Sequence, residues 1–164
     1  MRICCWPAAA IASPCQQNGS SRVTGVRIAK ALRDHITAEA GQRCGYCLTP
    51  QEHTAMPMEI EHIIPRAIGG PTTQDNLWLA CPLCNGHKAT QTHGTDPMSG
   101  DRTPIFNPRK QIWGEHFAWS QDGTRIVGLS ACGRTTIAAL QLNNEYLVKA
   151  RRRWVMAGWH PPQE

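Results

Sequence analysis

Two cysteine pairs with the same spacing, Cys44-x-x-Cys47 and Cys81-x-x-Cys84, constrain the fold of this chain more than any other feature of the sequence. A gap of two residues lets both sulfurs of a pair reach one tetrahedral ion, and two such pairs complete a four-thiolate site with no open coordination position. The sequence therefore predicts a structural Zn²⁺ site. The pairs are separated by 33 residues, more than a short zinc ribbon requires, so this segment must contain folded structure of its own.

Other uses of these cysteines are less favoured. A redox role is typical of a single C-x-x-C motif in a βαβ context, whereas this sequence contains two such motifs. Four free thiols are the remaining alternative. The other four cysteines have no partner at ligand spacing, and we expect buried or incidental thiols at Cys4, Cys5, Cys15 and Cys132.

Length and composition indicate an ordinary globular protein. A chain of 164 residues, 41% of them hydrophobic, is long enough for one compact domain or for a small domain with a subdomain. No run approaches the roughly 18 apolar residues of a membrane-spanning helix, so we expect no membrane partner. The apolar N-terminal stretch contains Pro7 and no small-x-small cleavage site, which favours a cytoplasmic protein. The formal net charge of +5 is compatible with a polyanionic partner.

We divide the chain into three parts. Residues 1–22 show neither helical nor strand periodicity, which predicts a disordered leader. Residues 23–92 contain both cysteine pairs and form the predicted core. Residues 93–164 form an extension that wraps around this core, and we expect the two parts to pack as one domain.

Within the core, the spacing of apolar residues predicts an amphipathic helix over 26–40 that leads into the first cysteine pair. Alternation predicts a strand over 58–64, stopped by Pro65, and a second short strand over 77–80. A helix is then expected over 84–91.

In the extension, Gly, Pro, Thr and Asp dominate residues 93–108, which predicts mostly loop. Asp122-Gly123 is typical of a hairpin turn, here joining strands at 118–119 and 125–129. Asn143 is a good helix N-cap, and an apolar stripe follows it until Gly158. The fold class is therefore α+β, with a C-terminal hairpin and helix added to the core.

Further motifs lie between and after the cysteine pairs, and they resemble those of the HNH endonuclease family. In order, they are Glu61-His62-Ile63-x-Pro65, Gly69-Gly70, Asn76-Leu77 and Asn85-x-x-Lys88. The later part of the chain is similar to extended bacterial members, so the resemblance covers residues 26–161, although the nuclease motif is far more specific than the tail. The resemblance implies a ββα-metal core, also called a His-Me finger, with His62 on the first strand, Asn76 between the strands and Asn85 on the helix.

The chemistry of phosphodiester hydrolysis gives an independent reason for these residue types. It needs a base that takes a proton from water and a cation that stabilises charge on the phosphate. His62 suits the base, because an unperturbed imidazole has a pKa of ~6.5 and is mostly neutral at cellular pH. Glu61 and Asn85 offer oxygen ligands for Mg²⁺ or another divalent cation. The family resemblance further implies that Asn76 orients the loop and the His62 ring without binding metal.

Two departures from the family pattern affect this site. The family often has His where this chain has Asn85, which makes an H-N-N variant and leaves His87 as a second choice for that role. Glu61 replaces the more frequent Asp and is one methylene longer. Consecutive residues of a regular strand also point to opposite faces, so Glu61 and His62 converge only if the strand kinks near Pro65 or the phosphate lies over its edge.

Several basic residues can contact a nucleic acid or remain solvated. Lys88 and Arg66 are candidate phosphate-binding residues beside the site. Near the C-terminus, four cations occupy five residues: Lys149, Arg151, Arg152 and Arg153. A helix spreads them in angle, and Arg151 falls near the apolar stripe, so at least one of them is expected to be structural.

These features predict a metal-dependent endonuclease that acts on DNA, and the resemblance implies that it leaves 5′-phosphate and 3′-hydroxyl ends. The alternative from a different class is a zinc-stabilised nucleic-acid or protein binding module without catalysis. Cleavage preference and oligomeric state are left open by the sequence.

Overall fold

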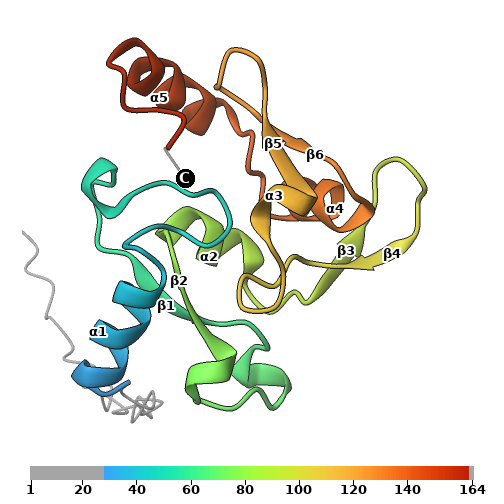
Figure 1. Ribbon diagram of the computed structural model, residues 1–164. Helices are drawn as coiled ribbons and strands as arrows, with labels where there is room; N and C mark the ends of the chain where they lie inside the picture. Colours follow the sequence, from blue (N-terminus) through green and yellow to red (C-terminus); the bar gives the residue numbers. More distant parts are fainter. Residues whose placement is uncertain (1–27, 163–164) are drawn as a thin grey trace, which may run out of the picture.

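The computed structural model describes residues 28–162 and has a mixed α+β architecture, which confirms the predicted fold class (Figure 1). The predicted leader, residues 1–22, lies outside the described residues. Within residues 28–162, no helix is long and apolar enough to cross a membrane.

The centre of the molecule is a finger made of two strands and a helix. β1 (Glu59–His62) and β2 (Leu77–Ala80) form an antiparallel ladder in which Glu59 pairs with Ala80 and His62 pairs with Leu77. The chain then enters α2 (Pro82–Lys88), which packs against β1. Cys81 is the N-cap of α2, and Pro82 occupies its first turn, where a missing N–H costs nothing. The predicted helix therefore begins two residues earlier than expected.

The connection between the two strands contains two short 3₁₀ turns, Arg66–Ile68 and Gln74–Asn76. Gly69 between them adopts a φ of +88°, which other residues rarely reach. Gly70 leaves no room for a side chain, because an added Cβ would lie 1.8 Å from the carbonyl oxygen of Ile64. The predicted Gly-Gly loop is thus folded tightly against the end of β1.

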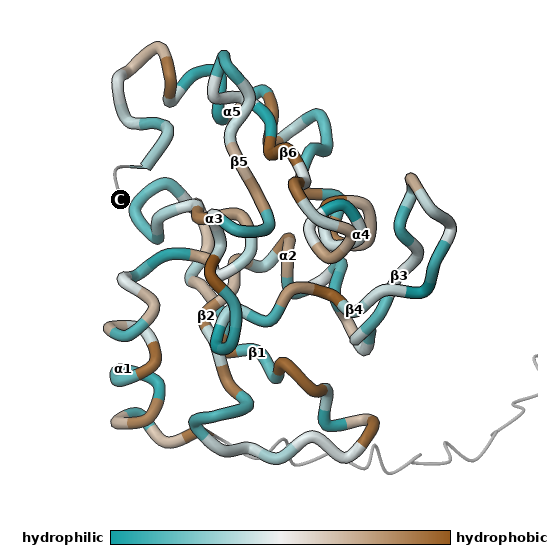
Figure 2. Tube along the Cα trace, turned by 45° about the vertical axis from the view of Figure 1, so that its right-hand side comes forward, coloured by the Kyte–Doolittle hydropathy of each residue, from teal (hydrophilic) through white to brown (hydrophobic). Residues whose placement is uncertain are grey.

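The segment before the finger consists of α1 (Lys30–Glu39), a cysteine loop and a 3₁₀ turn over Gln51–His53. α1 carries hydrophilic and hydrophobic residues side by side (Figure 2), and Ile36 is its fully buried residue. The helix ends close to the predicted residue 40, since Gly41 has a positive φ and breaks the helix, but it begins at Lys30, because residues 28 and 29 are not helical.

The extension forms two hairpins and three helices, which lie above and to the right of the finger in Figure 1. Its elements are β3 (His93–Thr95), β4 (Arg102–Pro104), α3 (Trp113–His116), β5 (Phe117–Trp119), β6 (Ile126–Gly128), α4 (Ala131–Ala139) and α5 (Glu145–Met156). β3 pairs with β4 and β5 pairs with β6, both antiparallel. The predicted Asp-Gly hairpin is present, and Gly123 has a φ of +68°.

Three features of the extension differ from the sequence prediction. The N-cap of α5 is Asn144, whose side chain accepts from the Leu147 N–H, and not the predicted Asn143. Residues 93–108 were predicted as mostly loop, but they include the β3–β4 hairpin, whose three-residue strands are too short for a periodic signal. α4 was not predicted, because Gly133, Thr135 and Thr136 are weak helix formers. Its helical conformation is fixed by tertiary packing, since these three residues are buried, and by Ser130, whose hydroxyl accepts from the Gly133 N–H.

One apolar core runs through both parts of the chain. It includes Ile36 of α1, Leu77 of β2, Phe106, Phe117 of β5 and Leu142 before α5. A direct polar contact also joins the two parts, because the indole N–H of Trp113 donates to the carbonyl of Tyr46 at 3.0 Å. The extension therefore packs on the cysteine loop itself.

Candidate active site and zinc site

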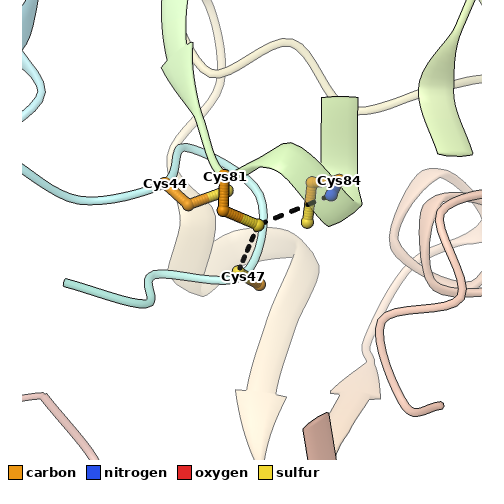
Figure 3. A group of neighbouring side chains, drawn as sticks. All are labelled: Cys44, Cys47, Cys81 and Cys84. Carbon is orange, nitrogen blue, oxygen red and sulfur yellow. Dashed lines mark hydrogen bonds between the residues drawn. The ribbon is translucent and has the colours of Figure 1, made fainter. Parts of the chain in front are cut away.

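The four paired cysteines are buried and form one cluster (Figure 3), to which the first pair contributes from the loop after α1 and the second from the β2–α2 junction. Their sulfur atoms all lie within 4.8 Å of one another, and the sulfurs of Cys47 and Cys81 are 3.8 Å apart. Tetrahedral coordination with Zn–S bonds of about 2.3 Å requires sulfur separations of about 3.8 Å. The cluster is therefore compatible with a structural zinc ion.

Local geometry explains why this loop can present its sulfurs. Leu48 has a φ of +54°, which turns the chain back so that the Cys44 N–H donates to the Thr49 carbonyl at 3.0 Å. A Cβ at Gly45 would lie 2.2 Å from the Trp78 ring, so only glycine allows the loop to pack on β2. The predicted C-G-Y-C motif thus depends on its glycine as well as on its thiols.

The cysteines depend on one another electrostatically. Burial raises the pKa of Cys44 well above its usual range, whereas a hydrogen bond with Cys44 lowers the pKa of Cys47. Four adjacent thiols cannot all ionise in an apolar site unless a cation compensates them. Metal binding must therefore release protons.

His62 ends β1 and is partly exposed. Its Nε2 lies 2.9 Å from the Thr72 hydroxyl, so the loop between the strands holds one side of the ring. Burial lowers the pKa of His62, and the charges of Arg66 and Lys88 act in the same direction. The imidazole is therefore neutral near pH 7, which is the form that can accept a proton.

Asn76 is buried and fastens the same loop at three points. Its Oδ1 accepts from the Ile64 N–H at 2.8 Å, and its Nδ2 donates to the carbonyls of Ile64 and Pro71 at 2.9 and 2.8 Å. These contacts hold the chain directly after β1. The contacts of Asn76 are thus to the loop backbone, whereas the His62 ring contacts Thr72.

Glu61 faces the interior of the finger, with 2% of its surface exposed. One carboxylate oxygen accepts from the Tyr46 hydroxyl, and the other lies 3.0 Å from the Lys88 ammonium. The second oxygen makes an ion pair without hydrogen-bond geometry. Burial raises the pKa of Glu61, and the charge of Lys88 opposes that shift.

Lys88 is also buried, with 2% of its surface exposed, and its ammonium donates to the His62 carbonyl at 2.9 Å. The structure therefore does not place Lys88 where it could meet a phosphate at the surface, contrary to its predicted candidate role. Lys88 acts instead as a buried link between Glu61 and the end of β1. Arg66, the other phosphate-binding candidate, is exposed.

The predicted convergence of Glu61 and Asn85 on one ion is not seen. The amide of Asn85 donates to the carboxylate of Glu59, an exposed residue two positions before Glu61. The reason is geometric: Glu59 and Glu61 share one face of β1, and Asn85 and Lys88 share one face of α2. Two parallel contacts result, Asn85 with Glu59 and Lys88 with Glu61. Glu59 is not among the predicted site residues, although its spacing of two residues from Glu61 on a strand indicates a shared face.

A divalent cation fits one of these two pairs better than the other. Glu59 has a carboxylate near solvent, and Asn85 would add an amide oxygen if its amide turned over, since it now presents an N–H to Glu59. Two such hard ligands would leave room for water and phosphate oxygens. The carboxylate of Glu61 is already neutralised by Lys88 and shielded from solvent. The donor set therefore favours Glu59 with Asn85.

The basic residues near the C-terminus point in different directions from α5, so they differ in exposure. Arg151 is completely buried, whereas Arg152 and Arg153 are exposed and Lys149 pairs with Glu145 at 2.8 Å. The expectation that at least one of these cations is structural is thus met by Arg151. Cys132 is buried and lies outside the cysteine cluster, near Gln111.

Lys88→Met is expected to destabilise the protein by about 3–5 kcal/mol, because it leaves the Glu61 carboxylate buried without its partner. The double variant Lys88→Met/Glu61→Gln should recover most of that loss, since it removes both charges and keeps an acceptor for Tyr46. Urea denaturation of the three proteins measures both values. Equal losses in the single and double variants would contradict the coupling.

One comparison with known proteins finds a match. Residues 44–91 match the model of the HNH endonuclease family, a segment that contains both cysteine pairs, β1, β2 and α2. No curated protein and no solved structure matches the chain. The chain therefore contains an HNH endonuclease domain, which indicates a nuclease-type function and nucleic-acid binding. The extension after residue 91 lies outside the match.

Proposed function

We propose that this protein is a metal-dependent endonuclease that hydrolyses DNA phosphodiester bonds. The observation that carries the proposal is the composition of the finger: a neutral, partly exposed His62 ends the same strand that presents Glu59 to Asn85. Zn²⁺ bound by Cys44, Cys47, Cys81 and Cys84 is structural in this proposal, because a closed thiolate site has no position for substrate.

His62 acts as the general base. Its Nε2 is engaged by Thr72, so Nδ1 is the nitrogen available to take a proton from the attacking water. Asn76 keeps the loop that carries Thr72 in place, and Lys88 holds the His62 carbonyl. Arg66 is exposed close to His62 in sequence and provides a positive charge for a phosphate. Mg²⁺ or a similar ion, held by Glu59 and Asn85, would stabilise negative charge at the phosphate. Since Glu59 and His62 lie on opposite faces of β1, this proposal requires the phosphate to lie over the edge of the strand.

Glutamine variants distinguish the proposed roles of Glu59 and Glu61. Glu59→Gln should raise the Mg²⁺ concentration needed for half-maximal cleavage without lowering the melting temperature, because its carboxylate is exposed. Glu61→Gln should mainly lower the melting temperature, because it disrupts the ion pair with Lys88. If instead Glu61→Gln alone raised the Mg²⁺ requirement, Glu61 would be the ligand, as the family resemblance implies.

Relaxation of supercoiled plasmid by the zinc-loaded protein tests the function. We expect nicking in Mg²⁺ and none when Mg²⁺ is omitted, a comparison that leaves zinc bound, unlike addition of a strong chelator. A non-catalytic binding module would instead retard DNA in a salt-dependent manner without nicking it. That outcome would contradict the proposed nuclease activity and favour the binding module.

The pH dependence follows from the environment of His62. Because its pKa is lowered, the rate should fall on the acid side only below the ordinary value of ~6.5. Arg66→Gln removes a charge that lowers this pKa, so the acid limb should move to higher pH, whereas Arg152→Gln should not move it. Single-turnover rates between pH 4.5 and 8, which span roughly two units on either side of that value, measure the limb. An acid limb that stays in place in Arg66→Gln would contradict the assignment.

A further inference from the structure

Arg151, in the middle of α5, carries a buried charge without a carboxylate partner. It has no exposed surface, and among residues 28–162 no Asp or Glu lies within ion-pair distance of its guanidinium. Nη1 donates to the Leu142 carbonyl at 2.9 Å, and the group lies 5.2 Å from the centre of the Trp119 ring. Nε and Nη2 have no hydrogen-bond partner. Such a buried cation is strongly unfavourable unless negative charge compensates it.

The other buried charges of the described residues are balanced in pairs. Glu61 pairs with Lys88, and Asp96 pairs with Arg134 through two short contacts of 2.9 and 2.6 Å. Arg151 is therefore the charge that the side-chain carboxylates leave uncompensated.

One cysteine of the cluster shares a cavity wall with the helix that carries this charge. Cys81 lines the same cavity of about 300 Å³ as Leu147, Ala150 and Trp154, the residues of α5 that flank Arg151. Leu142, whose carbonyl accepts from Arg151, belongs to the same apolar core as the four cysteines. Burial lowers the pKa of Arg151, and negative charge on the cysteines, Cys47 foremost, opposes that shift.

We propose that Arg151 is the counter-ion of the zinc centre. Zn²⁺ with four thiolates has a net charge of −2, which is costly in an apolar core, and the guanidinium compensates half of it. Arg151 thereby makes the extension part of the zinc site and explains a buried cation on a helix that lies outside the HNH domain. The role concerns metal retention and is independent of whether the protein cleaves DNA.

Zinc affinity in four proteins tests this role: the wild type, Arg151→Met, Arg151→Lys and Arg152→Met. Competition with a chromogenic chelator should show a loss of about 10- to 100-fold for Arg151→Met, the usual effect of removing a residue that supports metal ligands. Arg151→Lys keeps the charge and should stay within a few-fold of the wild type. Arg152→Met, the exposed neighbour on the same helix, should equal the wild type.

Melting temperatures with and without zinc give the second measurement. In the zinc-free form the guanidinium is uncompensated, so Arg151→Met should be at least as stable as the wild type, although it is less stable with zinc bound. The proposal is overturned if Arg151→Met binds zinc as tightly as Arg152→Met, or if Arg151→Lys loses as much affinity as Arg151→Met. If Arg151→Met does not fold, a ten-fold loss of zinc affinity in Arg151→Lys overturns the proposal instead.

Discussion

Cys81→Ser should deprive the protein of zinc and lower its melting temperature by at least about 10 °C. Cys81 joins β2 to α2, and its sulfur also caps the helix by accepting from the Cys84 N–H. Structural zinc contributes on the order of 10 kcal/mol to folding in small domains, and each kcal/mol shifts the melting temperature of a chain this size by roughly 2–4 °C. The loss of folded structure should therefore extend from the cysteine cluster to the finger.

Cys132→Ser is the matched control, because Cys132 is also buried but lies outside the cluster. It should keep one zinc ion per chain and lose far less stability. Zinc content by elemental analysis and melting by circular dichroism provide the measurement. If Cys81→Ser retained its zinc and its melting temperature, the four cysteines would not be a metal site.

His62→Ala is expected to reduce the cleavage rate by about 10²- to 10⁴-fold, the usual contribution of a general base. Its zinc content and melting temperature should not change, because His62 is partly exposed and its ring makes one hydrogen bond, to Thr72. Single-turnover cleavage of a labelled duplex in Mg²⁺ measures the loss.

His87→Ala serves as the control for this substitution. His87 lies on α2 within the matched segment and was the second choice for the role given to Asn85. Cleavage at the wild-type rate is expected, since the amide of Asn85 already contacts Glu59. A fully active His62→Ala protein would exclude His62 as the base.

The sequence predicted the elements whose determinants are local. Two thiols separated by two residues meet one ion whatever surrounds them, so the spacing sufficed to predict the cluster of Cys44, Cys47, Cys81 and Cys84. The two strands of the finger and the Asp-Gly hairpin also follow from short-range patterns. α4 depends on burial against the rest of the molecule, and its local signal, the N-cap Ser130, is followed by weak helix formers.

Side-chain direction within the site was harder to predict than the site residues themselves. The motif places Glu61 beside His62, but strand geometry sends them to different faces, and α2 then pairs Glu61 with Lys88. The direction of the Lys88 side chain was equally hard to predict: its charge suggested a phosphate contact, although the residue is buried. The buried position of Arg151 was easier to predict. On a helix it lies on the same side as the apolar stripe of α5, whereas its basic neighbours lie at other angles.

The most direct test of the account is the position of the metal and the phosphate in a crystal of zinc-loaded His62→Ala with duplex DNA and Mn²⁺. Manganese replaces Mg²⁺ and is located by its anomalous scattering, while the substitution prevents turnover. Because Glu59 and position 62 lie on opposite faces of β1, we predict manganese at Glu59 and Asn85 with a DNA phosphate over the edge of the strand, within reach of both this ion and position 62. Manganese at another site, or DNA bound away from the end of β1, would contradict the account.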